Sequence, residues 1–257
     1  MRSIELPAGL PTPVILLSHR APVQFRRAEG ERSARRGAGG LVTALTDLAT
    51  QLDDVRWVCA ASGEEDVAVA AEHEGRAVPV TLGSEPRIVA EDEDPGDEPV
   101  VELRLVDVPS EQHERFYGVI ANPILWFIQH GLYGVWSAPD LNDAEHEAFE
   151  DGYVPVNEAF ADAVADEVEA AGGSALVMLH DYHFYLVADR VRERCPEALI
   201  SLFVHIPWPG PDAWRVLPPS MRERLLRGLL GCDVVGFHTT ESARNFVVSC
   251  RELLGAR

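Results

Sequence analysis

Short, continuous apolar runs alternate along this chain with longer segments in which apolar residues recur every three or four positions. The short runs are typical of buried strands, and the longer spacing is typical of helices that bury one face. Strands that alternate with helices predict an α/β fold with a parallel sheet. The expected strands are Pro13–Ser18, Val55–Ala60, Ala175–Leu179, Leu199–Val204 and Asp233–Phe237. The expected helices are Leu41–Leu48, Glu111–His130, a stretch over Asn142–Ala171 broken near 152–155, Tyr182–Arg194, Ser220–Leu230 and Thr239–Leu254.

Two stretches depart from this pattern. Residues 19–40 form a polar, arginine-rich segment that is expected to be a loop and closes in Gly37-Ala38-Gly39-Gly40. Residues 61–110 are acidic, and only Ala77–Leu82 and Val100–Val106 within them have the character of strands. The like charges of the run 91–98 predict an exposed hairpin tip or a disordered loop.

Composition excludes several classes of protein. The apolar fraction is 46%, which suffices for a packed core, and the net charge is −20. Nucleic-acid backbones demand a basic surface, and a chain as acidic as this one is therefore expected to bind no nucleic acid. No signal peptide is evident and no run reaches the roughly 18 apolar residues of a membrane helix. Four cysteines without a C-x-x-C pair fit reduced thiols, and we expect a cytoplasmic protein that contacts no membrane.

Titratable residues follow two neighbouring strands of the predicted sheet. His180-Asp181-Tyr182-His183 comes after the third expected strand, and His205 comes after the fourth. Ligands of open parallel sheets bind at the carboxyl ends of the strands, so the sequence predicts a site here. Pro207 and Pro209 restrict the backbone after His205 and would hold its imidazole still. The spacing does not favour a metal site, and Asp181 also suits the N-cap of the next helix.

Two further groups of residues are candidates for ligand binding. Arg20 follows the first strand, and Gly39 and Gly40 precede a helix, which is a layout that cradles phosphates. On spacing alone, a mobile glycine turn is the simpler explanation of this loop. Tyr117 and Trp126 lie on opposite sides of an ideal helix, so they can share a site only if that helix is interrupted between them. Otherwise they are core aromatics.

Together these motifs resemble the N-terminal half of a trehalose-6-phosphate synthase-type glycosyltransferase, of glycosyltransferase family 20 and the two-domain GT-B architecture. The resemblance implies a Rossmann-like parallel sheet flanked by helices, the acceptor-side domain, over residues 1–257, with an acidic insertion at about 61–110. The motifs that carry it are Ser18–Val23, Gly39–Leu41, Phe116–Trp126, His180–His183, His205–Pro209, Arg215–Pro218, Gly228–Asp233, Gly236–Thr239, Ala243–Phe246 and Ser249–Arg251.

The resemblance also implies an activity and the residues that serve it. Such an enzyme moves glucose from UDP-glucose or GDP-glucose to glucose 6-phosphate with retention of configuration and gives trehalose 6-phosphate. It needs no metal and no cofactor, because the departing diphosphate can itself take the acceptor's proton. The implied acceptor-binding residues are Arg20, Tyr117, Trp126 and Asp181, the donor-binding residues are Gly39, Gly40 and His205, and the catalytic residues are Asp181 and His205.

The chain departs from the family's pattern in ways that keep alternatives open. Ser18-His19-Arg20 stands where the family has Ser-Asn-Arg, and Gly118 follows Tyr117. A pseudo-glycosyltransferase or related enzyme that uses another phosphorylated polyol or cyclitol as acceptor would fit nearly as well. The chain stops at Arg257, before the C-terminal nucleotide-sugar domain, which must then act in cis or in trans. We expect an excised piece; a natural half and a non-catalytic sugar-phosphate-binding or regulatory module are the alternatives. Apolar surface meant for the missing domain would favour a homo-oligomer.

Overall fold

The computed structural model describes residues 9–132 and 141–256. The chain divides into two compact units, one of Met1–Asp107 with Ala163–Val177 and one of Val108–Asp162 with Met178–Arg257. Its main sheet has seven strands among the described residues, in the order β5-β6-β4-β1-β7-β8-β9. The first residues of β7 belong to the first unit, and the last residues of β7 belong to the second. The pairs β1–β4, β4–β6 and β8–β9 are parallel, and β5 is antiparallel to β6. The predicted α/β fold with a mostly parallel sheet is confirmed.

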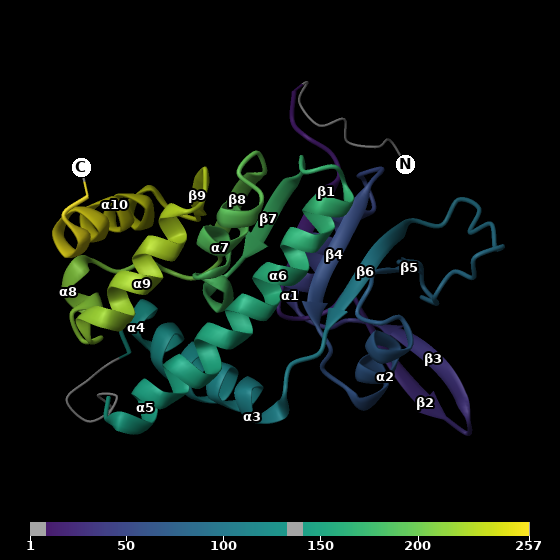
Figure 1. Cartoon of the computed structure of the whole chain (residues 1–257), viewed down its shortest axis with the longest axis horizontal. Coiled ribbons are helices and arrows are strands. Elements are labelled where there is room, and N and C mark those ends of the chain that lie inside the picture. The colour runs from purple at the N-terminus through teal and green to yellow at the C-terminus, as the bar shows by residue number, and fades with distance from the viewer. Residues whose placement is uncertain (1–8, 133–140, 257) are drawn as a thin grey trace. The chain divides into compact units, whose positions relative to one another are not determined.

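In the first unit, β1, β4 and β6 run side by side (Figure 1). All four residues of β1 are buried, which explains its unbroken apolar sequence. The strands are β1 Val14–Leu17, β2 Val23–Ala28, β3 Glu31–Arg36, β4 Val55–Ala60, β5 Val78–Thr81, β6 Val100–Val106 and the shared β7 Leu176–His180. The helices are α1 Gly40–Ala49 and α2 Glu64–Glu72, together with the end of α6.

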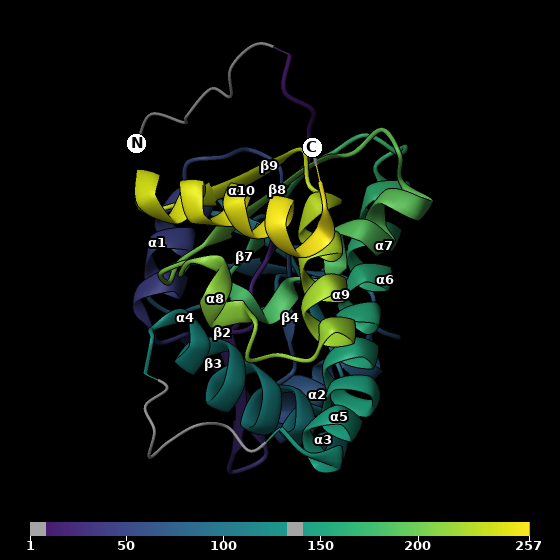
Figure 2. The same ribbon diagram turned by 90° about the vertical axis from the view of Figure 1, so that its left-hand side faces the viewer.

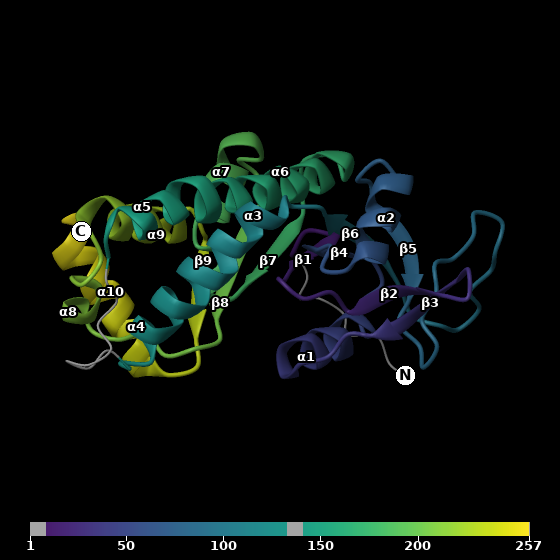
Figure 3. The same ribbon diagram turned by 90° about the horizontal axis from the view of Figure 1, so that it is seen from below.

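One expectation about the first unit is wrong, and one helix was not predicted. Residues 23–36 are not a loop but the antiparallel hairpin β2–β3, which pairs Val23 with Arg36. The acidic stretch holds the helix α2 in addition to its two strands, and α2 lies against β2 (Figure 3). The run 91–98 lies in the connection between β5 and β6, as the sequence predicts, where Arg87 forms ion pairs with Glu93 and Glu98.

The second unit is mainly helical around β8 and β9. Figure 2 shows α10 beside α8 and α7 beside α9, and both pairs are in contact. Its strands are β8 Leu199–Val204, β9 Val234–Phe237 and the end of β7. Its helices are α3 Ser110–His113, the π-helix η1 Glu114–Trp126, α4 Phe127–Gln129, α5 Asp143–Ala148, the π-helix η2 Phe149–Tyr153, α6 Val154–Ala170, which ends in the first unit, the 3-10 turn η3 Tyr182–Phe184, α7 Val187–Arg194, α8 Pro211–Trp214, α9 Pro219–Leu230 and α10 Thr240–Leu254.

Two details of the second unit correct the expected helices. The single helix predicted over Tyr182–Arg194 is the short 3-10 turn η3 followed by the separate helix α7. The expected break near 152–155 is a π-helical stretch, η2, that leads directly into α6. Within the described part of the chain, none of the helices combines the length and the apolar character needed to cross a membrane.

Candidate functional site

Arg20 lies beside the glycine loop in the first unit. Its Nη1 donates a hydrogen bond to the carbonyl oxygen of Ala38 over 3.4 Å. A β-carbon at Gly39 would lie 3.5 Å from the same nitrogen, and the Gly39 φ of 129° is in a region that side chains rarely adopt. The distance is an ordinary contact, so it is the positive φ that requires glycine at this turn of the loop.

Helix α1 begins directly after this contact. Gly39 is its N-cap residue, and no acidic side chain lies in its first turn. The first N–H groups of a helix lack partners within it and carry partial positive charge, which favours a bound anion. The guanidinium of Arg20 and the start of α1, at Gly40, thus form a positively charged cradle that suits a phosphate.

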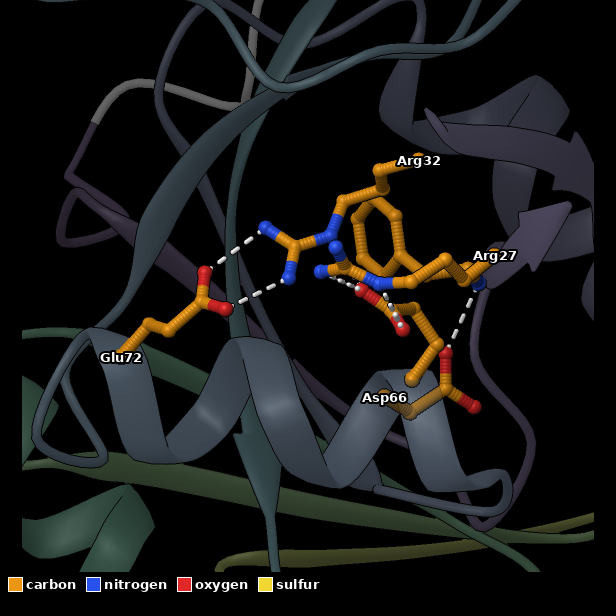
Figure 4. A network of polar contacts seen from close by, with 6 residues as sticks. Arg27, Arg32, Asp66 and Glu72 are labelled. Atoms are coloured by element: carbon orange, nitrogen blue, oxygen red, sulfur yellow. Dashed lines mark hydrogen bonds and ion pairs between the residues drawn. The ribbon is translucent and has the colours of Figure 1, made fainter. Parts of the chain in front are cut away.

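The hairpin β2–β3 connects Arg20 to the glycine loop, and ion pairs tie it to α2 (Figure 4). Arg32 donates two hydrogen bonds of 2.7 Å to the carboxylate of Glu72. Arg27 pairs with Glu65 over 2.9 Å, and the hydrogen bond from Arg27 is the largest cause that lowers the pKa of Glu65 to about 2. Paired arginines therefore fix the hairpin, where the sequence predicted an arginine-rich loop.

Asp66 anchors the same hairpin from inside, and we expect Asp66→Ala to lower the free energy of unfolding by about 2 kcal/mol. The carboxylate is 2% exposed and accepts the backbone N–H of Phe25 over 2.8 Å and that of Gly63 over 3.0 Å. Alanine would leave both donors unpaired. Urea unfolding of the chain measures the loss. Glu64→Ala, an exposed change in the same helical turn, serves as the control, and equal losses would contradict this role for Asp66.

The ends of β7 and β8 bring Asp181 and His205 together in the second unit, as the sequence predicts. The backbone N–H of His205 donates to Oδ1 of Asp181 over 3.3 Å, and the N–H of Asp181 donates to the carbonyl of Phe203 over 2.9 Å. His180 Nδ1 lies 3.1 Å from His205 Nε2, so one imidazole donates to the other. The other ring nitrogen of His180 is buried and has no hydrogen-bond partner among the described residues.

Burial shifts the pKa values of all three side chains towards their neutral forms. It raises the pKa of Asp181 to about 6, although backbone hydrogen bonds from Tyr182 and His205 act in the opposite direction and lower this pKa. It lowers the pKa of His180 to about 3 and that of His205 to about 4. At neutral pH the site therefore holds two neutral imidazoles beside a carboxylate that is largely ionised.

Asp181 does not act as the helix cap that the sequence suggested. It stands at the N-cap position of η3, but its side chain forms no capping hydrogen bond there of the usual kind. Its φ of 76° and ψ of 174° lie in a region that only glycine adopts easily. This conformation turns the carboxylate towards the N–H at the end of β8.

The two predicted aromatics lie on the wide helix η1. A π-helix bonds residue i to residue i+5, so nine positions span about two turns and bring Tyr117 and Trp126 back towards one side. The π-helix thus allows both aromatic side chains to lie on the same side, which an ideal α-helix does not. The Tyr117 ring stacks on His183 at 5.7 Å between centroids, and the Trp126 ring lies 4.1 Å from that of His130. His130 in turn lowers the pKa of Asp181 through its charge.

Each unit thus holds one group of the predicted residues. The first unit brings Arg20 to the loop of Gly39 and Gly40. The second brings Asp181 to His205 and Tyr117 to His183, while Trp126 packs against His130. Among residues 9–132 and 141–256, no group of three or more His, Cys, Asp or Glu side chains could hold a metal ion.

The sequence analysis did not identify the buried residues that form hydrogen bonds to the turn after Asp181. Tyr153 and Asn157 are both fully buried, and their side chains bond to the backbone of residues 182–186. The sequence does hold a signal, because Asn157 interrupts the apolar face of the stretch that becomes α6. A polar residue at a core position indicates a buried hydrogen-bond role.

Sequence comparisons identify the relatives of this chain. The model of glycosyltransferase family 20 matches residues 12–257. The trehalose-6-phosphate synthase of Mycobacterium avium (strain 104) is 33% identical over 247 residues, which is 94% of this chain and 42% of that protein. The UDP-forming alpha,alpha-trehalose-phosphate synthase A of Dictyostelium discoideum is 30% identical and matches 98% of the chain but 30% of its own length. Both names describe hexosyltransferases, and this chain spans less than half of each.

Solved structures share the fold. The N-terminal domain of Candida albicans trehalose-6-phosphate phosphatase covers 100% of this chain, with 22% sequence identity and a TM-score of 0.67. The Burkholderia xenovorans trehalose-phosphate synthase in complex with glucose 6-phosphate covers 93%, with 22% identity and a TM-score of 0.61. These likenesses show the fold alone. The family model covers nearly the whole chain, and the chain therefore belongs to glycosyltransferase family 20.

Proposed function

We propose that this chain is the acceptor-side half of a retaining glucosyltransferase that makes trehalose 6-phosphate from a nucleotide-linked glucose and glucose 6-phosphate. The observation that carries the proposal is the contact of Arg20 with the glycine loop at the start of α1. A sugar phosphate and a nucleotide diphosphate both need such a positively charged cradle. Relatives named UDP-forming synthases support UDP-glucose as the donor.

In the proposed reaction, the bond from the donor's anomeric carbon to the diphosphate breaks and a bond to the acceptor hydroxyl forms on the same face. The proton of that hydroxyl passes to an oxygen of the departing diphosphate. The protein supplies position and charge, and we assign no covalent nucleophile to it. The lowered pKa of His205 keeps its imidazole neutral, with one N–H. When its Nε2 accepts from His180, the N–H lies on Nδ1 and can donate a hydrogen bond to a sugar hydroxyl. Ionised Asp181 accepts hydrogen bonds from sugar hydroxyls.

Calorimetric titration of the chain with glucose 6-phosphate tests the acceptor half of this proposal. We expect saturable binding that neither glucose nor inorganic phosphate reproduces. Arg20→Ala should weaken the binding at least about tenfold, because a charge-assisted contact contributes roughly 1.5–3 kcal/mol. Arg26→Ala removes an exposed arginine from the neighbouring hairpin and should leave the affinity unchanged.

Two outcomes would overturn the assignment of Arg20 or of the acceptor. Equal affinities for the parent and the Arg20→Ala variant would show that this arginine does not hold the phosphate. Failure of the folded chain to bind glucose 6-phosphate while it binds another phosphorylated polyol or cyclitol would replace the proposed acceptor. Because the N-terminal domain of a phosphatase shares the fold, binding alone also fits a sugar-phosphate-binding module. Release of UDP from both substrates by this chain combined, in cis or in trans, with a nucleotide-sugar domain separates the two functions.

A further inference from the structure

The backbone of Asp181 is strained, and the surrounding structure has to maintain that strain. Its φ of 76° and ψ of 174° place it where a β-carbon clashes with the backbone, and it is not a glycine. A residue in such a region costs roughly 1–3 kcal/mol and persists only where its neighbours over-determine it. The neighbours that fix this turn are therefore part of how the carboxylate is placed.

Tyr153, at the end of η2, forms hydrogen bonds to two backbone groups of the segment that follows Asp181. The side chain is fully buried. Its hydroxyl donates to the carbonyl oxygen of Tyr182 over 2.8 Å and accepts the backbone N–H of Tyr185 over 3.3 Å. One hydroxyl thus satisfies two backbone groups, the first of which belongs to the residue directly after Asp181.

Asn157, one helical turn further along α6, bonds to the same segment. Its Nδ2 donates to the carbonyl oxygens of Tyr153 and His183 over 2.9 and 3.0 Å. Its Oδ1 accepts the backbone N–H of Leu186 over 3.1 Å. The amide therefore links the tyrosine to the turn, and both of its polar atoms are satisfied although the side chain is fully buried.

We propose that Tyr153 and Asn157 are positioning residues, which together hold the backbone of Asp181 in its strained conformation and so keep its carboxylate at the end of β8. Their consequence for glucosyl transfer rests on the proposed function, whereas their hold on the turn does not. Neither side chain holds the carboxylate directly. Both act through backbone groups of residues 182, 183, 185 and 186.

A double-mutant cycle on the chain's own unfolding tests the hold on the turn. Tyr153→Phe removes hydrogen bonds but lets the turn relax and recover part of the strain. In an Asp181→Gly background no strain remains to be recovered. Tyr153→Phe should therefore raise the unfolding equilibrium constant about fivefold more in that background than in the parent, a factor that corresponds to the lower end of the strain range.

Two controls separate strain from charge and from general packing. Asp181→Asn removes the charge but keeps the β-carbon, so Tyr153→Phe should have its parental effect in this background. Tyr185→Phe removes another buried hydroxyl of the same turn, which donates to Gln129 over 2.8 Å, and its effect should be the same with and without Asp181→Gly. Additive effects of Tyr153→Phe and Asp181→Gly would overturn the proposal.

A spectroscopic readout follows the carboxylate itself. In the parent, burial holds the pKa of Asp181 near 6, and ¹³C NMR of labelled aspartate reports its titration. Asn157→Leu and Tyr153→Phe should each lower that pKa, because a relaxed turn carries the carboxylate towards water, and Tyr185→Phe should not. An unchanged titration in both variants would contradict the proposal. Neither measurement needs a substrate, so a failure here is distinct from a failure to bind glucose 6-phosphate.

Discussion

Asp181→Asn should stabilise the chain above pH 6 by on the order of 3 kcal/mol and have little effect near pH 4. Burial raises the pKa of the folded-state carboxyl to about 6, from an ordinary value of 3.8. The folded chain therefore holds this proton more tightly than the unfolded chain. Stability is lost as the pH rises from about 4 to about 6, and above that range the full penalty of a buried charge remains.

Urea unfolding of the parent and the variant between pH 4 and pH 7.5 measures this difference. His180 and His205 destabilise the fold in acid in both proteins, because burial lowers the pKa of each, and their contribution cancels in the comparison. Asp189→Asn, an exposed change on α7, should show no pH-dependent gain. A gain from Asp181→Asn that is the same at every pH would mean that its carboxyl is not forced to ionise inside the fold.

Gly228→Ala should lower the free energy of unfolding by about 3 kcal/mol. Gly228 lies on the face of α9 that meets the turn before α7. A β-carbon there would lie 2.2 Å from the carbonyl oxygen of Tyr185 and 2.9 Å from the Cα of Leu186. Both contacts are to backbone, so no side-chain rotation relieves them, and the helix or the turn must move.

A glycine with open space around it provides the matched control. A β-carbon at Gly210 would have no atom within 4 Å, and its φ of −63° is ordinary for any residue. Gly210→Ala should therefore change the free energy of unfolding by less than about 0.5 kcal/mol. Thermal or urea unfolding of both variants makes the comparison, and a Gly228→Ala chain as stable as the control would show that α9 does not pack this closely.

The centre of the parallel sheet could be predicted because β1 and β4 are buried at nearly every residue, and so on both faces. Val14–Leu17 and Val55–Ala60 are short, nearly unbroken apolar runs, and few other structures bury such runs. The hairpin at 23–36 could not be predicted in the same way. Its arginines look exposed in the sequence, and the partners that neutralise them, Glu65 and Glu72, lie about 40 residues away on a helix hidden within an acidic stretch.

The candidate site was predictable where a motif follows a strand. His180, Asp181 and His205 are at strand ends because the apolar runs before them fix where the strands stop. The geometry around them was not predictable. A π-helix has no distinct pattern of apolar residues, and a positive φ at an aspartate follows from tertiary contacts such as those of Tyr153, which no local sequence encodes.

The turn at Asp181 also bears on how this protein can evolve or be engineered. Two separate costs fall on one residue, a strained backbone and an ionised carboxyl in a buried place. Glycine would remove the first cost and asparagine the second. Either substitution therefore raises the stability of the fold and is favoured when variants are selected for thermal stability alone. A library screened for thermal tolerance alone will therefore enrich substitutions at this position, and only a screen that also scores ligand binding will retain the aspartate.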